Sequence, residues 1–472
     1  MPTLYINPNA PCVLVSRSAV ARFFKFHSLA EIRAEVARLG LELSFVEDLA
    51  PLFQGVRLGP WSVRNALCIQ PMEGCDGTLD GQPAELTYRR YRRFGAGGAG
   101  LIWGEAVAVV PEARANPRQL WLADHSASGL ERMLRECRAA HREAFGDDTG
   151  LVVGLQLTHS GRYSHGQALL ACECPLLDAR LKGPARLLSD DDLDRLVEAY
   201  VAAAKLAYRI GFQFVDIKQC HRYLLNELLG ARTRPGKYGG SLENRTRLAR
   251  TIFQAICAEV PELLLATRLN VYDGIPYGAA WSAPLASCWG TAPDDPERPD
   301  LTEPLAWIGT MRTLGVQLVN VSMGNPYASP HLLRPFERPP PDGYEAPEHP
   351  LIGVDRHVRL TAQVQRAFPE LAVVGSGYSY LQEFFPQAGA AARINGGVTF
   401  VGLGRGSLSM PDFARLLQET GKLDRRRVCR TFSYCTALMR SKHNELGQFA
   451  AGCPPFDKEV YGELWTLAKR KP

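Results

Sequence analysis

The sequence predicts an α/β fold, a closed (β/α)8 TIM barrel with an N-terminal helical extension and long loops over the carboxyl-terminal face. Eight apolar runs of strand character alternate with eight helical patterns between residues 67 and 420. Strands separated by helices are typical of parallel βαβ units. Eight such units fit a closed barrel better than an open, doubly wound sheet. A barrel of this kind routinely forms one unit of roughly 200–250 residues, so a 472-residue chain does not require several domains.

The elements follow one another in a regular order. The expected strands are residues 67–70, 100–109, 151–158, 214–217, 264–269, 318–321, 373–375 and 400–404. The expected helices are residues 86–94, 129–144, 191–208, 242–259, 305–313, 357–368, 380–385 and 410–420. The third helix shows the reasoning. Ser189 caps it, Asp190 to Asp192 place negative charge at the positive end of its dipole, and apolar residues then recur on one face.

Three parts of the chain are expected around this pattern. Residues 1–50 form an N-terminal extension, residues 51–420 the barrel, and residues 421–472 a C-terminal extension packed on the barrel. The N-terminal part contains an amphipathic helix at 29–39, which Gly40 ends.

Two segments rich in proline and glycine, 274–303 and 325–356, each follow the end of an expected strand. Loops of this length are usually functional or disordered. On a barrel they would overhang the active-site face, where we expect them to select the substrate.

Composition excludes several classes of function. The net charge of +5 is small for 472 residues, and no run of Lys and Arg with interleaved aromatics is present, so we expect no nucleic-acid partner. No apolar stretch approaches the roughly 18–20 residues of a membrane span, and the N-terminus lacks the features of a signal peptide. Twelve cysteines without a C-x-x-C motif predict reduced thiols and a cytoplasmic protein. This composition is also compatible with a homo-oligomer.

Glycines follow the last two expected strands, in Gly375-Ser376-Gly377 and Gly402-Leu403-Gly404-Arg405. Glycine allows backbone N–H groups to approach an anion, and an arginine can hold the anion by two hydrogen bonds. Barrels commonly bind phosphate at these two strands. Turns also need glycine for their own geometry, but two such sites at these strands favour a phosphate site.

The stretch VDIKQCHRYLLNELL, residues 215–229, places Lys218, Cys220, His221 and Tyr223 directly after an expected buried strand. All four side chains can exchange protons. Because active sites of barrels lie at the carboxyl ends of the strands, this stretch is a candidate active site.

Four sequence blocks together resemble the old yellow enzyme family of FMN-dependent oxidoreductases. They are GFQFVDIKQCHRYLLNELLGARTRPGKYGGSLENRTRLAR at 211–250, QLTHSGR at 156–162, RLNVYDG at 268–274 and VGLGRGSLSMPDF at 401–413. Their order and spacing match the family from about residue 52 to residue 416.

The resemblance implies an FMN lying over the barrel mouth. Pro71, Met72, Glu73 and Ala106 would line its isoalloxazine ring, and Gln156 would bond the pyrimidine edge. Arg268 would lie near N1 and the C2 carbonyl, where a cation stabilises the reduced flavin. Ser376, Gly377, Gly404 and Arg405 would hold the phosphate. NAD(P)H is the implied reductant.

The resemblance also implies roles for residues 215–229, a stretch that begins in the fourth expected strand. Family members carry His-x-x-Asn or His-x-x-His, which binds the activating oxygen of the substrate, followed two residues later by a proton-donating tyrosine. This chain has Lys218-x-x-His221-x-Tyr223, so lysine replaces the first histidine. An ammonium there would polarise the oxygen more strongly than a neutral imidazole. Alternatively, Lys218 extends to solvent and pairs with a carboxylate. Tyr223 could likewise be a core residue that caps the loop.

Two further positions depart from the family. Glu73 stands where relatives place Thr or Cys beside the flavin; facing the ring it would make the flavin a stronger reductant, and otherwise it would turn to an arginine such as Arg64 or Arg114. Longer relatives carry a four-cysteine iron–sulfur site and a further nucleotide-binding domain after the barrel. Here Cys429, Cys435 and Cys453 occur without a fourth cysteine in a matching pattern. We therefore expect no cluster, no metal and no additional domain.

The leading hypothesis is an NAD(P)H-driven reduction of an activated C=C bond in a small unsaturated substrate, as in ene-reductases. A second hypothesis in the same class is FMN-dependent oxidation of an amine or methylated substrate, with electrons passed to a partner protein. A third, from another class, is a flavin-free, phosphate-binding barrel lyase with Lys218 as Schiff-base nucleophile.

Overall fold

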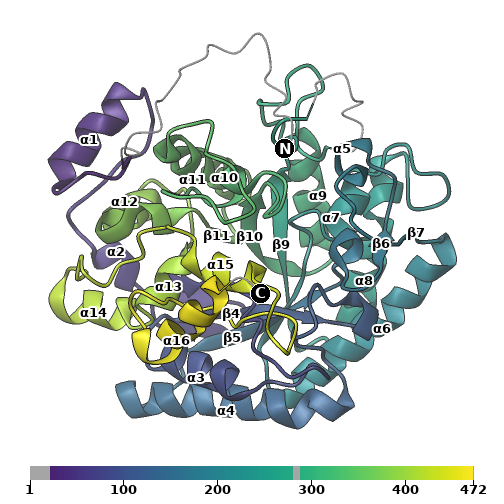
Figure 1. The fold of residues 1–472 in the computed structure, drawn as a ribbon, viewed down its shortest axis with the longest axis horizontal. Helices are drawn as coiled ribbons and strands as arrows, with labels where there is room; N and C mark the ends of the chain where they lie inside the picture. The colour runs from purple at the N-terminus through teal and green to yellow at the C-terminus, as the bar shows by residue number, and fades with distance from the viewer. Residues whose placement is uncertain (1–21, 280–287, 471–472) are drawn as a thin grey trace.

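A computed structural model describes residues 22–279 and 288–470 and shows the expected barrel (Figure 1). Eight parallel strands close in the order β10-β11-β12-β3-β4-β5-β8-β9, so the first and last strands of the barrel are hydrogen-bonded neighbours. The barrel strands are β3 (Leu67–Ile69), β4 (Leu101–Ala108), β5 (Val152–Thr158), β8 (Phe214–Ile217), β9 (Leu264–Tyr272), β10 (Val316–Met323), β11 (Ala372–Gly375) and β12 (Phe400–Leu403).

Helices surround this barrel and bury their apolar faces against it (Figure 1). They are α3 (Glu85–Gly95), α4 (Asp124–Phe145), α6 (Asp190–Ile210), α8 (Leu242–Glu259), α9 (Thr302–Thr313), α11 (Pro350–Ala367), α12 (Phe385–Ile394), α13 (Arg405–Ser409) and α14 (Phe413–Thr420). Helix α6 begins as its sequence predicts, because the Ser189 hydroxyl accepts a hydrogen bond from the amide of Asp192 and the Asp192 side chain accepts one in return.

Shorter elements lie in the connections between strands and helices. They are α5 (Pro175–Asp178), α7 (Leu224–Leu229), α10 (Pro330–Leu333), the 3-10 turns η1 (Pro111–Ala113) and η2 (Gly161–Tyr163), and the paired strands β6 (Ala168–Leu170) and β7 (Ala185–Leu187). Several of these, such as α7 and α10, follow the carboxyl ends of barrel strands and shape the mouth.

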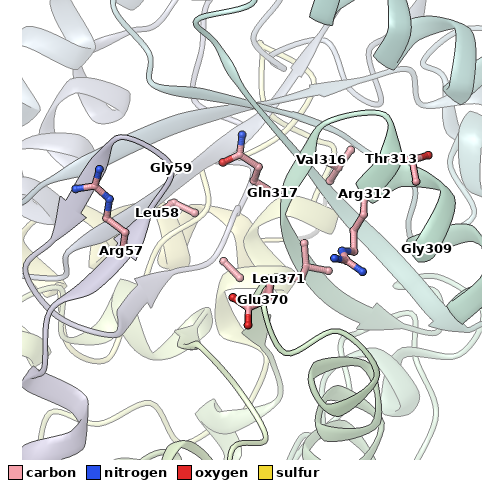
Figure 2. Close-up of a pocket in the computed structure, with 11 residues that line it drawn as sticks. Arg57, Leu58, Gly59, Gly309, Arg312, Thr313, Val316, Gln317, Glu370 and Leu371 are labelled. Atoms are coloured by element: carbon pink, nitrogen blue, oxygen red, sulfur yellow. The ribbon is translucent and has the colours of Figure 1, made fainter.

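The amino ends of the strands are covered by a hairpin of β1 (Val56–Leu58) and β2 (Trp61–Val63). A cavity of about 380 Å³ lies beside it, between the hairpin turn, the end of α9 and the first residues of β10 and β11 (Figure 2). Its charged side chains, Arg57, Arg312 and Glu370, are all exposed. This cavity is at the opposite end of the barrel from the ends that carry catalytic residues in such folds.

Two segments outside the barrel pack against it. Helices α1 (Leu29–Arg38) and α2 (Ala50–Phe53) belong to the N-terminal part, whose first 21 residues lie outside the described range. Helices α15 (Tyr434–Arg440) and α16 (Lys458–Lys469) belong to the C-terminal part, yellow in Figure 1. Asp457 at the start of α16 forms an ion pair with Arg89 of α3 at 2.7 Å and a second with Arg93.

Two expectations about local structure were wrong. Residues 325–356 are not one long loop, because α10 lies within them and α11 begins at Pro350, where the side chain of His349 accepts a hydrogen bond from the amide of Leu351. The helix expected at 380–385 is a 3-10 turn, η4 (Tyr378–Phe384), followed by α12, which the sequence reading missed. Among the described residues, no helix combines the length and the apolar character needed to cross a lipid bilayer.

Candidate active site

A cavity of about 220 Å³ opens at the carboxyl ends of the barrel strands. All thirteen residues predicted from the sequence to bind the cofactor or act in catalysis line it, although they lie on or directly after seven different strands. They are Pro71, Met72, Glu73, Ala106, Gln156, Lys218, His221, Tyr223, Arg268, Ser376, Gly377, Gly404 and Arg405. The closure of the barrel is what brings these distant parts of the sequence together.

The backbone after β8 is held in an unusual conformation. His221 and Arg222 have φ of 68° and 61°, a left-handed region that costs free energy for residues other than glycine. Buried contacts hold them there: Arg222 forms an ion pair with Asp273 at 2.9 Å, and Asn325 donates to the carbonyl of His221 at 2.8 Å. This turn directs both His221 and Tyr223 into the cavity.

His221 and Tyr223 are both neutral at ordinary pH. Burial, together with the neighbouring cations, lowers the pKa of His221 well below its usual value. Its Nε2 lies 3.3 Å from the Ser322 hydroxyl. Burial also raises the pKa of Tyr223 well above its usual value, with Glu73 adding to the rise, so the phenol keeps its proton. Both side chains can therefore donate a hydrogen bond, and Tyr223 can donate a proton.

Lys218 lies inside the cavity wall, and its side chain is only 3% exposed. The expectation that it extends to solvent is therefore wrong, but the expected carboxylate partner is present. Its Nζ lies 3.9 Å from Glu73 Oε1 and 3.9 Å from the centre of the Tyr223 ring. Both separations exceed a hydrogen-bond length, so the ammonium keeps donors for a substrate. Burial lowers the pKa of Lys218, and Glu73 opposes that shift.

Glu73 faces the cavity and does not turn to either arginine that the sequence suggested. Arg64 contacts His141, and Arg114 donates to backbone carbonyls. Apart from Lys218, the Glu73 carboxylate accepts a hydrogen bond from Asn116 Nδ2 at 3.3 Å. Burial raises its pKa, and Lys218 opposes that shift.

A buried ion-pair network fixes the loop that carries Glu73. The amide of Gly74 donates to Glu105 at 2.9 Å, and Arg90 bonds Glu105 at 2.5 Å and also Asp76. One guanidinium thus faces two carboxylates away from water. Burial, together with Asp76, raises the pKa of Glu105 to about 7.

The floor of the cavity is polar and ordered. Gln156 donates to Asp216 at 2.5 Å, and Asp216 also accepts the backbone N–H of Arg268 at 2.7 Å. Gln70 donates to the hydroxyl of Ser376 at 3.1 Å. The Nε of Arg268 is shielded from solvent without a hydrogen-bond partner.

The glycines after β11 and β12 adjoin a second shielded guanidinium. Gly377 has a φ of 91°, and a side chain there would meet the ring of His357. A side chain at Gly404 would have Gln70 and Met72 in van der Waals contact at 3.8 Å. Arg405 donates to the carbonyl of Pro335 at 2.6 Å, while its Nη1 is shielded and without a partner.

Several cavity residues were missed in the sequence. They are Tyr327 and Arg334 after β10, and Cys435, Thr436, Met439 and Arg440 of α15. Tyr327 stacks on Tyr163 at 4.3 Å between ring centres, and Arg440 lies over Tyr327. These residues come from loops and from the C-terminal part, where no strand end indicates their direction.

The three C-terminal cysteines, Cys429, Cys435 and Cys453, line a neighbouring cavity of about 180 Å³ that also borders Arg405. Within residues 22–279 and 288–470, no three or more His, Cys, Asp or Glu side chains are arranged to hold a metal ion.

The cavity fits the flavin mononucleotide that the resemblance implies. Arg268 on β9 and Arg405 after β12 present shielded, unpartnered nitrogens at two places along the mouth, three strands apart in the closed sheet. A polyanionic ligand with an acceptor-rich ring at one end and a phosphate at the other would satisfy both. The Gln156 amide and the apolar side chains of Pro71, Met72 and Ala106 suit the ring.

Sequence comparison finds a matching family model and individual relatives. A model of the NADH:flavin oxidoreductase / NADH oxidase family matches residues 51–285. The NADPH dehydrogenase of Halalkalibacterium halodurans is 31% identical over 207 residues, which cover 43% of this chain and 57% of that protein. The NADPH dehydrogenase of Bacillus pumilus is 32% identical over 225 residues, which cover 47% of this chain and 62% of that protein. The matched part thus spans about three-fifths of each relative.

Solved structures share the fold at lower identity. The old yellow enzyme homologue from Zymomonas mobilis superposes with a TM-score of 0.58 at 21% identity, over 81% of this chain and 96% of that one. Morphinone reductase in complex with tetrahydroNAD gives 0.56 at 21%, over 79% and 92%. A 2-naphthoyl-CoA reductase complex gives 0.66 at 17%, over 89% and 58%.

Proposed function

This chain belongs, through barrel residues 51–285, to the NADH:flavin oxidoreductase / NADH oxidase family, and from that membership we propose that it is an FMN-dependent oxidoreductase. Its reaction is the reduction of an activated C=C bond in a small unsaturated molecule, with NAD(P)H as the reductant. The observation that supports the proposal is that the side chains we assign to flavin binding and those we assign to proton donation line one and the same cavity.

The residues divide between two tasks. Gln156, Arg268 and the phosphate end at Gly377, Gly404 and Arg405 would hold FMN, with Pro71, Met72, Ala106 and Ser376 beside it. When bound, FMN supplies hydride transfer between NAD(P)H and the substrate. The remaining steps belong to Lys218, His221 and Tyr223.

His221 and Lys218 would bind the activating oxygen of the substrate. The neutral imidazole can donate one N–H, and the ammonium adds a full positive charge where negative charge develops. Tyr223 would then give its proton to the α-carbon, since its raised pKa keeps the hydroxyl protonated at neutral pH. The left-handed turn at His221 and Arg222 keeps these donors in place before substrate arrives.

We place the enzyme in the cytoplasm and expect no nucleic-acid partner. All eleven described cysteines are free thiols, most of them buried, which suits a reducing compartment. A homo-oligomer remains compatible with the proposal.

Anaerobic kinetics test the proposed function. The FMN-loaded protein should be reduced by NADPH or NADH and reoxidised by some member of a panel of enones, enoates and nitroalkenes. Lys218→Ala should slow the reoxidation about 10²–10³-fold and leave the reduction nearly intact, because the ammonium acts on the substrate oxygen alone. Lys218→His should recover part of the loss, and Lys205→Ala, at an exposed lysine, should change neither step.

Two results would overturn the proposal. One is a protein that takes up no FMN. The other is a covalent adduct at Lys218 trapped by borohydride with substrate, which would indicate Schiff-base chemistry instead.

A further inference from the structure

A second arginine faces the phosphate end of the cavity. Arg334 directly follows α10, and its Nη1 donates to the hydroxyl of Thr436 in α15 at 2.8 Å. Its Nε and Nη2 are shielded from solvent and have no hydrogen-bond partner. Arg405 shares this condition, because its Nη1 is also shielded and unpartnered. Both side chains line the same cavity.

These two arginines also have no carboxylate partner among the described residues. In the described parts of the chain, 22–279 and 288–470, neither Arg334 nor Arg405 forms an ion pair. Buried arginines elsewhere in the fold do form one, namely Arg90, Arg162, Arg222, Arg234 and Arg245. Uncompensated charges away from water are costly unless something pairs with them. The two guanidiniums are therefore suited to an anion that comes from outside the protein.

The two guanidiniums lie close enough to repel each other. Burial lowers the pKa of Arg334 to about 10, and Arg405 and Arg440 add to the decrease. An anion between Arg334 and Arg405 would remove this repulsion and satisfy their unpartnered nitrogens at the same time. Gly404 and the left-handed Gly377 line the same cavity. Planar guanidiniums match the oxygen geometry of a phosphate.

We propose that Arg334 is a second phosphate-binding arginine, which with Arg405 forms a two-guanidinium clamp for a phosphate monoester dianion. The proposal rests on the proposed function, because FMN is the phosphate monoester that this cavity would take. It adds a ligand from outside the family-matched residues 51–285. It also gives the C-terminal part a task, since Thr436 positions Arg334.

The test compares two flavins that differ only in the phosphate. Binding of FMN and of riboflavin to the apoprotein is measured by quenching of flavin fluorescence. Arg334→Met should weaken FMN binding about 10- to 100-fold and leave riboflavin binding unchanged, because a charge-assisted hydrogen bond to phosphate is lost. The FMN affinity of Arg334→Lys should be intermediate, because lysine keeps the positive charge but lacks the paired N–H donors of the guanidinium. Arg338→Met, at an exposed arginine on the same loop, is the matched control and should bind both flavins normally.

Thermal unfolding provides a second readout, in which the effect of the substitution should differ between the protein without flavin and the protein with FMN. Without flavin, Arg334→Met should unfold at the same temperature as the wild type or higher, because repulsion with Arg405 is relieved. With FMN, its rise in unfolding temperature should be smaller than that of the wild type.

Equal weakening of FMN and riboflavin binding in Arg334→Met would show that Arg334 has a structural role. That result would overturn the clamp and leave the proposed function standing. Unchanged FMN binding would overturn it as well. A wild-type protein that binds neither flavin would overturn the proposed function together with this inference.

Discussion

The pair formed by Lys218 and Glu73 should stabilise the fold only when both members are present. Their charged atoms lie 3.9 Å apart, and their side chains are 3% and 14% exposed. Two unit charges at this distance interact by about 4 kcal/mol at an effective dielectric constant of about 20. Water in the open mouth reduces this value, so we expect a coupling free energy of about 2 kcal/mol.

A double-mutant cycle measures that coupling. Glu73→Gln, Lys218→Met and the double variant are unfolded with urea at pH 7 as apoproteins, and far-UV circular dichroism follows the transition. Each single variant leaves one buried charge without its partner, so it should lose more stability than the pair is worth by itself. The double variant should lose less than the two single losses together.

Acid should remove the coupling. Burial raises the pKa of Glu73 above its usual value, so its carboxylate takes up a proton at a higher pH than an exposed glutamate does. The coupling should therefore decline on acidification before exposed ion pairs are affected. Lys205 and Glu259, 2.7 Å apart and about half exposed, give the control cycle and should show less than about 1 kcal/mol. A coupling below about 0.5 kcal/mol for Lys218 and Glu73 at pH 7 would refute this account.

Three other expectations follow from single contacts. Tyr223→Phe should slow reoxidation by substrates that need a proton at carbon about 10²–10⁴-fold and spare reduction by NADPH; equal slowing of both steps in stopped-flow traces would exclude the proton-donor role. Glu105 has a folded-state pKa of about 7, raised from 4.5, so its contribution to stability falls as pH rises from about 4.5 to about 7, by at most about 3 kcal/mol. Glu105→Gln should flatten this decline in urea titrations across that range, and an unchanged slope would contradict it. Arg222→Met should cost about 3–5 kcal/mol, because Asp273 is left buried without its ion pair; a urea-measured loss under about 1 kcal/mol would show that the left-handed turn is held by other contacts.

The barrel was predictable because its signals are local and repeated. Strand β8 and helix α8 were predicted at both ends: Ser241 caps α8, whose buried residues recur along one face, and β8 is a short, fully buried run. Helix α11 begins seven residues before its predicted start, because a proline at its first turn reads as a loop although this position suits proline. Helix α12 was missed because small residues on both sides leave no apolar stripe.

The residues that line the cavity could be predicted where a barrel strand positions them. A residue within a barrel strand has a direction set by that strand, so Arg268 of β9 and Gln156 of β5 could be placed near the mouth from the strand pattern together with the family resemblance. Arg334 and Thr436 could not be placed in this way. Each reaches the cavity from a segment whose path depends on contacts between residues far apart in the sequence, such as the hydrogen bond between Arg334 and Thr436. Neither residue lies in a recognisable motif.

The two departures from the family at the barrel mouth are best understood as one change. A lysine alone at position 218 would be a buried charge without compensation, and a glutamate alone at position 73 would be another. Placed 3.9 Å apart, the two charges compensate each other. The net charge of the pair therefore stays zero, as it would with the family's histidine at position 218 and its threonine or cysteine at position 73. The field of such a close pair falls off faster with distance than that of a single charge. Glu73 should therefore influence the flavin less than a lone carboxylate would. In the proposed reaction, the main chemical consequence would then be at the substrate oxygen, which the Lys218 ammonium would contact.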